Sequence, residues 1–155
     1  MYGPDAQSRL FYLNELPLDD FKEIKLSPET ATVKAEHNAS WVGEAKEQLV
    51  MPDQGWGKKW ITEHVHSAWV EIHFNDKLFT VSGIGFVSAN DCPHRDPKKI
   101  TISYFDEETQ AFKESTVVRP EWDGERHCLK KFKIPACETK AFKFDISHDG
   151  GHEQL

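Results

Sequence analysis

Between Ala31 and Ile146, apolar residues recur at every second position in short runs that polar turns separate. A period of two is typical of β-strands that bury one face, whereas an amphipathic helix repeats every three to four residues. The runs cover residues 32–36, 69–74, 78–87, 99–105, 111–118, 128–134 and 140–146. About seven short strands without a long helix predict an all-β fold, an antiparallel β-sandwich of the jelly-roll kind.

The first 30 residues follow a different pattern, because their apolar residues cluster without a sustained period and Pro4, Pro17 and Pro28 interrupt them. A short helix over residues 19–25 and a strand over residues 21–26 both fit this stretch. We expect residues 1–30 to form an apolar N-terminal arm that packs on a β-sandwich domain spanning residues 31–155.

Composition limits the function classes that are open to the chain. Its 155 residues suit one domain, and 19 basic against 26 acidic residues give a net charge of −7. This charge argues against binding to nucleic acid, and no apolar run is long enough to insert into a membrane. Three cysteines and no secretory signal in these residues predict a cytoplasmic chain without disulfides, either a monomer or a subunit of a hetero-complex.

The connections between the predicted strands differ in length in a regular way. If successive strands alternate in direction, the long links 37–68, 88–98 and 119–127 lie at one end, and the short links 75–77, 106–110 and 135–139 lie at the other. Long loops at one end of a rigid scaffold are a common location for binding sites.

Four of the five tryptophans fall in the long links. Indole rings stack on sugars or peptide side chains, and arginine donates to carboxylates and carbonyls. For Trp56, Trp60 and Trp122, a structural role in closing the end of the sandwich fits as well as a role as a ligand platform. The predicted ligand-binding residues are Trp56, Trp60, Asn90, Asp91, Arg95, Arg119 and Trp122.

Several local motifs resemble the discoidin family, the coagulation-factor type C domains. Gly55-Trp56 leads to residues 68–74, which resemble the family's tryptophan-led strand. Residues 81–86 resemble its glycine-containing strand, residues 88–96 would occupy its projecting spike, and residues 100–104 resemble the strand that follows the spike. The resemblance implies a galactose-binding-like sandwich that binds a protein or a carbohydrate through its loops. The paired terminal cysteines of extracellular members are missing, which implies that the chain is more similar to the intracellular members, which act as adaptors in larger complexes. Some relatives bind calcium, so calcium is possible here, and no other cofactor is implied.

An enzymatic alternative rests on two histidines and a carboxylate. His64, His66 and Glu71, with Gly57 before them, resemble the first cupin motif, although one residue too many separates Gly57 from His64 and the second motif has no counterpart. Histidines at i and i+2 project to the same side of a strand, where a nearby carboxylate can complete a metal site. The alternative function is therefore a cupin-like metal-dependent enzyme.

Other chemistry has less support in the sequence. Cys92-Pro93-His94 and His127-Cys128 suggest a zinc site, but the paired cysteines of a structural site are absent. No catalytic serine elbow, phosphate-binding loop or zinc-protease motif is present. We therefore predict a non-enzymatic binding or adaptor module. A further alternative is an assembly subunit that makes its contact through an exposed sheet face carrying Lys131, Lys133 and Lys143.

Overall fold

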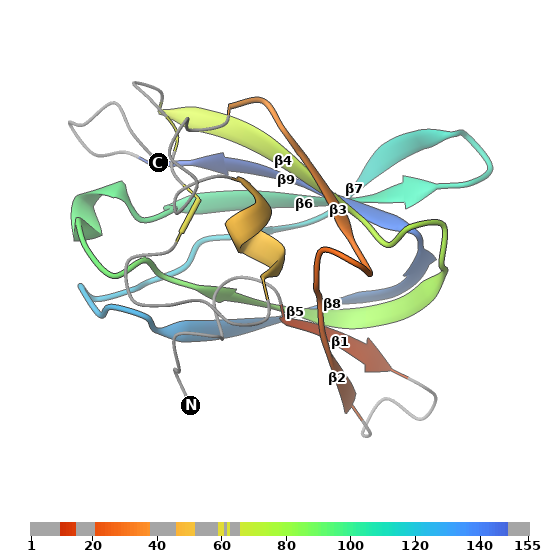
Figure 1. Ribbon diagram of the computed structural model, residues 1–155, viewed down its shortest axis with the longest axis horizontal. Helices are drawn as coiled ribbons and strands as arrows, with labels where there is room; N and C mark the ends of the chain where they lie inside the picture. Colours follow the sequence, from red (N-terminus) through yellow and green to blue (C-terminus); the bar gives the residue numbers. More distant parts are fainter. Residues whose placement is uncertain are drawn as a thin grey trace.

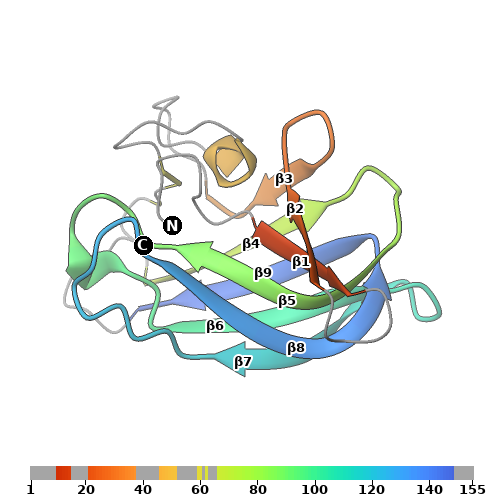
Figure 2. The same ribbon diagram turned by 90° about the horizontal axis from the view of Figure 1, so that it is seen from below.

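Two antiparallel sheets face each other in the computed structural model, which describes residues 10–14, 21–37, 46–51, 59–60, 62 and 66–148 (Figure 1 and Figure 2). The smaller sheet has the strand order β2-β1-β5-β8, and the larger has the order β3-β4-β9-β6-β7. The strands are β1 Leu10–Asn14, β2 Phe21–Lys25, β3 Thr32–Ala35, β4 Ser67–His73, β5 Phe79–Val87, β6 Lys99–Asp106, β7 Ala111–Val118, β8 Leu129–Thr139 and β9 Ala141–Ser147. Two short 3-10 helices, η3 Lys46–Val50 and η4 Pro93–Arg95, complete the described elements. The predicted fold class, an antiparallel β-sandwich, is confirmed.

The core lies between the sheets and follows the period of two. Strand β4 alternates buried Ala68, Val70 and Ile72 with side chains that are partly exposed on its other face. Phe142 and Phe144 of β9 project to the same interior, where Phe142 meets Phe74 edge to face at 6.2 Å between ring centroids. Each large apolar side chain removed from water in this way contributes roughly 1.5–3 kcal/mol. Burial of one face of each sheet therefore explains why the alternating runs become strands.

One predicted link is wrong: residues 135–139 belong to strand β8 rather than to a turn. Val81 pairs with Cys137 and Gly83 with Lys133, so residues 134–136 lie opposite Ser82 alone. Such a bulge interrupts the hydrogen-bond ladder, and a proline is tolerated there because it has no N–H to donate. The connection to β9 is reduced to Lys140, and the hydroxyl of Thr139 accepts a bond from the Ala141 amide at 3.3 Å.

The first 30 residues contribute two strands to the smaller sheet (Figure 1). Strand β1 pairs with β5, with Leu10 opposite Gly85 and Phe11 opposite Ile84, and β2 pairs with β1. Of the helix over residues 19–25 and the strand over residues 21–26 that fit this stretch, the structure has the strand, β2. Within the described residues, no helix is long and apolar enough to cross a membrane.

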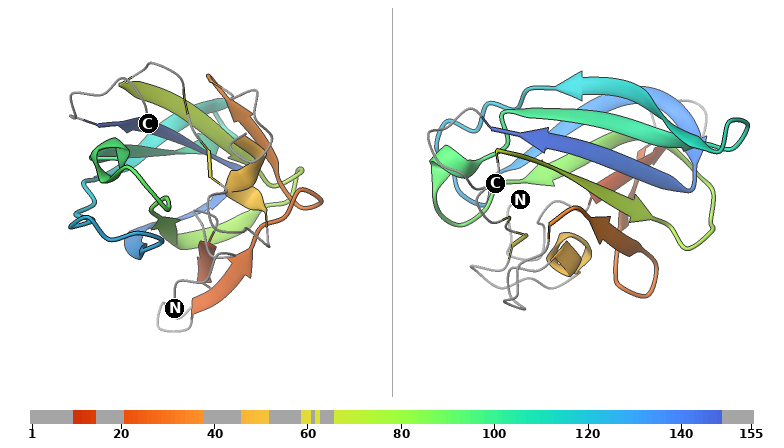
Figure 3. Two further views of the ribbon diagram at one scale, coloured as in Figure 1. Left: turned by 60° about the vertical axis from the view of Figure 1, so that its left-hand side comes forward. Right: turned by 90° about the horizontal axis from the view of Figure 1, so that it is seen from above.

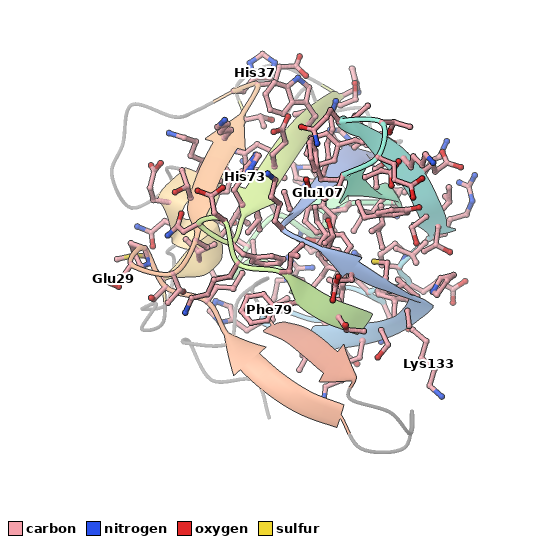
Figure 4. The ribbon with its side chains drawn as sticks, turned by 90° about the vertical axis from the view of Figure 1, so that its right-hand side faces the viewer. Glu29, His37, His73, Phe79, Glu107 and Lys133 are labelled. Atoms are coloured by element: carbon pink, nitrogen blue, oxygen red, sulfur yellow. The ribbon has the colours of Figure 1, made fainter. Side chains whose placement is uncertain are left out.

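The long links 88–98 and 119–127 gather at one end, as the alternation of strand directions predicts, and the described residues Lys59 and Trp60 of the third long link lie beside them. The amide of Lys98 donates to Ser147 at 2.8 Å, and that of Ser88 donates to Cys128 at 3.1 Å, so the ends of β9 and β5 meet the starts of β6 and β8. We call residues 88–98 and 119–128, with Lys59 and Trp60, the loop end; the left panel of Figure 3 brings it forward. The opposite end carries short turns, among them the β6–β7 turn with Glu107 (Figure 4).

Candidate functional site

A cavity of about 110 Å³ runs from the loop end into the space between the sheets. Its inner surface is apolar and comes from both sheets, while its outer part is lined by Lys59, Asp91 and Arg95. The inner surface is formed by Val70, Ile72, Phe86, Ile100, Phe144 and Ile146. An apolar interior with a charged rim is suited to a ligand that has both an apolar and a polar part.

Two of the predicted tryptophans line this cavity. Trp122 is buried, with 5% of its surface exposed, and its indole N–H donates to the carbonyl of Pro97 at 2.9 Å. Trp60 is half-buried and donates to the carbonyl of His37 at 3.0 Å. Trp122 is therefore almost fully covered by its neighbours, whereas Trp60 keeps part of its surface exposed at the rim. Trp56 lies outside the described residues.

Asn90 and Asp91 lie at the rim and hold Lys59. The Lys59 ammonium donates to Asn90 Oδ1 at 3.0 Å and to both carboxylate oxygens of Asp91 at 2.9 Å. The Lys59 side chain is 11% exposed and that of Asp91 is 45% exposed. These bonds join two links that are about 30 residues apart in the chain, and the Asp91 carboxylate remains accessible from solvent.

A buried ion pair joins the link 88–98 to the link 119–127. The Arg126 guanidinium pairs with the Asp96 carboxylate, donating to Oδ1 at 3.0 Å, and also donates to the carbonyl of Asp91 at 2.8 Å. Burial raises the pKa of Asp96, and the neighbouring Arg126 charge opposes that rise. This pair is not predicted from the sequence, because no spacing relates Asp96 to Arg126.

The remaining predicted arginines lie in different places. Arg95 lines the cavity, and its guanidinium contacts the sulfur of Cys92, whose backbone is left-handed with φ of 48°. Arg119 is exposed just after β7 and is not among the residues that line the cavity. The structure therefore gathers Trp60, Asp91, Arg95 and Trp122 around the cavity, with Asn90 beside them.

His127 lies beneath the rim and is 3% exposed. Burial lowers the pKa of its imidazole, and the charges of Arg126 and Lys59 lower it further. The neutral imidazole is therefore favoured at this position.

The metal-site alternatives are not assembled in the described part of the chain, where no three histidine, cysteine, aspartate or glutamate side chains cluster around a possible ion. Glu71 faces outward on β4 and contacts His73 Nε2 at 2.8 Å, whereas the ring of His66 packs against His148 with centroids 5.2 Å apart. Strand alternation therefore separates Glu71 from His66. His64 lies outside the described residues, and none of the three cysteines forms a disulfide.

The lysines predicted to share one exposed sheet face are divided between the two sheets. Lys131 and Lys133 lie on β8 of the smaller sheet, whereas Lys143 lies on β9 of the larger. These lysines therefore do not form one surface.

No family model matches the chain, and no curated protein matches its sequence. Solved structures do match its fold. A family 32 carbohydrate-binding module from Clostridium perfringens, in complex with GalNAc-β-1,3-galactose, has a TM-score of 0.67 at 11% identity over 84% of this chain and 92% of that one. The family 32 module of C. perfringens NanJ, in complex with galactose, has a TM-score of 0.63 at 12% identity over 81% and 87%.

The family 32 module of Streptococcus pneumoniae EndoD has a TM-score of 0.61 at 16% identity over 77% of this chain and 84% of that one. At these identities the similarity establishes the fold alone. The chain is a β-sandwich of the galactose-binding-like kind, which is the fold that the resemblance to discoidin domains implies.

Proposed function

We propose that the chain is a non-catalytic carbohydrate-binding module that holds its ligand at the loop end. The observation that carries this proposal is the convergence of separate long links on one cavity, with Trp60, Asp91 and Arg95 among its lining residues. The fold is also that of modules whose solved structures hold sugars.

The chemistry of the rim suits a sugar. The C–H face of a sugar ring packs on an indole such as Trp60, while its hydroxyls donate to a carboxylate and accept from a guanidinium. The Lys59–Asp91 and Arg126–Asp96 contacts fix the rim before any ligand arrives. Binding then costs less ordering of side chains, which favours affinity.

We expect Trp60→Ala and Arg95→Ala each to weaken glycan binding by about tenfold or more, as truncation of an interface anchor does. A glycan array identifies the ligand, and titration calorimetry with that glycan measures the affinities. The control is Lys133→Ala, an exposed position on β8 that projects away from the sheets (Figure 4). Wild-type affinity in both rim variants, with unchanged circular dichroism, would contradict a site at the loop end.

The apolar inner surface of the cavity supports a second candidate, in which the loop end holds an apolar side chain of a protein partner. Phe86, Phe144 and Ile146 offer such a side chain contacts that a hydroxyl-rich ligand does not use. A cytoplasmic adaptor role belongs with this candidate. Capture of a partner from native lysate by the wild type but not by Trp60→Ala, together with a blank glycan array, would favour it over the first.

A further inference from the structure

The outer face of the larger sheet carries a shallow groove of about 250 Å³, on the opposite side of that sheet from the cavity. It spans the central strands β4, β9 and β6, and most of the side chains that line it are polar. Two neighbouring rows cross the three strands: Trp69, Asp145 and Thr101 in one, and Ser67, Ser147 and Lys99 in the other. Glu36, whose amide donates to the Trp69 carbonyl at 3.0 Å, extends the first row beyond β4.

The indole of Trp69 is half-buried and is held from one side. The Lys143 ammonium lies over the ring at 5.3 Å from its centroid, a distance at which cations are attracted to an aromatic face. Lys143 pairs with Glu71, in the row next to Trp69 that is farther from the loop end. Ser67 lies in the row on the other side of Trp69, which is nearer to the loop end. The groove therefore lies on the side of Trp69 that is away from Lys143.

The polar groups of this groove differ from those of the loop end. At the loop end, Lys59 and Arg126 are bonded to carboxylates of the same chain. In the part of the chain that the structure describes, Asp145, Thr101 and Lys99 make no side-chain hydrogen bond or ion pair with one another. Asp145 is exposed, and Thr101 and Lys99 are half-buried. A carboxylate, a hydroxyl and an ammonium are thus presented to solvent beside an aromatic ring.

We propose that this groove is a second carbohydrate site, independent of the loop end, in which a pyranose ring stacks on Trp69. Asp145 accepts from two sugar hydroxyls, and Thr101 and Lys99 bond to others. Backbone pairing on both sides of β4 and β9 fixes these positions, and sites on strands are held more rigidly than sites on loops. The groove lies below the range of about 300–1,000 Å³ for drug-sized ligands, which suits a single sugar ring.

The test uses protein labelled with ¹⁵N at its tryptophan indoles, titrated with the methyl glycosides of galactose, glucose and mannose. The Trp69 signal, assigned by Trp69→Phe, should shift and saturate with at least one of them. Asp145→Asn should weaken that binding by about tenfold or more, because a charged acceptor is lost. Glu138→Gln, which removes an exposed carboxylate from β8 of the other sheet, is the matched control and should leave the binding unchanged.

The Trp60 signal reports the loop end in the same spectra, so the two sites can fail separately. A saturable shift of the Trp60 signal alone contradicts the second site and is consistent with the proposed function. Saturable movement of Trp69 alone supports the second site and counts against the loop end. The second site is also overturned if no sugar moves Trp69, or if Asp145→Asn binds as tightly as the wild type.

Discussion

His127 combines a left-handed backbone, with φ of 51°, and an imidazole that is buried beneath the rim. Its pKa is lowered in the folded state, whereas the unfolded chain takes up a proton near the ordinary value of 6.5. Its contribution to stability is therefore complete above about pH 6.5 and is lost as the pH falls through the folded-state pKa.

We expect urea unfolding to show a larger loss of stability between about pH 7.5 and pH 5.5 in the wild type than in His127→Asn. Asparagine tolerates the left-handed backbone, so the variant removes the titrating group without adding strain. Asp96, whose pKa is raised in the folded state, contributes stability that is lost as the pH rises through the acidic range. Because the wild type and His127→Asn share Asp96, this effect cancels when the two proteins are compared. An equal loss in both proteins would show that His127 does not cause the pH dependence.

At the level of single residues, the sequence identified part of the candidate site. Trp60, Asp91 and Arg95 were found because they occur in long links and have side chains suited to recognition. The pairing of Lys59 with Asp91 and of Arg126 with Asp96 was not found, because each pair joins different links. Local spacing carries no information about such contacts. Only the folded arrangement of the links brings these charges together.

Strand β1 is the element whose removal should have the largest consequence. It lies between β2 and β5, so deleting residues 1–26 exposes the edge of β5 from Val81 to Gly85. An unpaired edge invites association with other chains. We expect the deletion to lower the melting temperature by many degrees, equivalent to a few kcal/mol, and to cause aggregation in size-exclusion chromatography. Deletion of residues 1–9, which precede β1, is the control; an unchanged melting curve for the longer deletion would show that the hairpin is dispensable.

At the level of elements, the sequence pattern found β3 to β9. Strands such as β4 alternate between a buried and a more exposed face, whereas β5 is buried on both faces from Val81 to Val87 and β7 has no fully buried residue. The pattern did not find β1, where Leu10 to Leu13 are four successive apolar or aromatic residues and carry no period of two. The bulge in β8 was also missed, because Pro135 and the polar residues around it have the composition of a turn. Tertiary pairing with β5 decides both cases, and pairing partners cannot be read from one segment alone.

At the scale of the whole molecule, the cavity between the sheets links stability to binding. Most of the side chains that line the inner part of the cavity are apolar, and unfilled space beside them forfeits van der Waals contacts. Filling part of it should therefore stabilise the fold. The same filling should weaken the binding of a ligand that places an apolar group in the cavity.

Val70→Ile adds one methyl group at a buried position that lines the cavity. We expect it to stabilise the protein by up to about 0.8 kcal/mol, which raises the melting temperature by roughly 2–3 °C. Val81→Ile makes the same change at a buried position that does not line the cavity, and overpacking there should destabilise instead. Thermal unfolding of the two variants gives this comparison, and calorimetry with the array-identified glycan shows whether Val70→Ile also weakens binding at the loop end. If both variants destabilise equally, the interior has no room for an added methyl group, and the ligand is held by the rim alone.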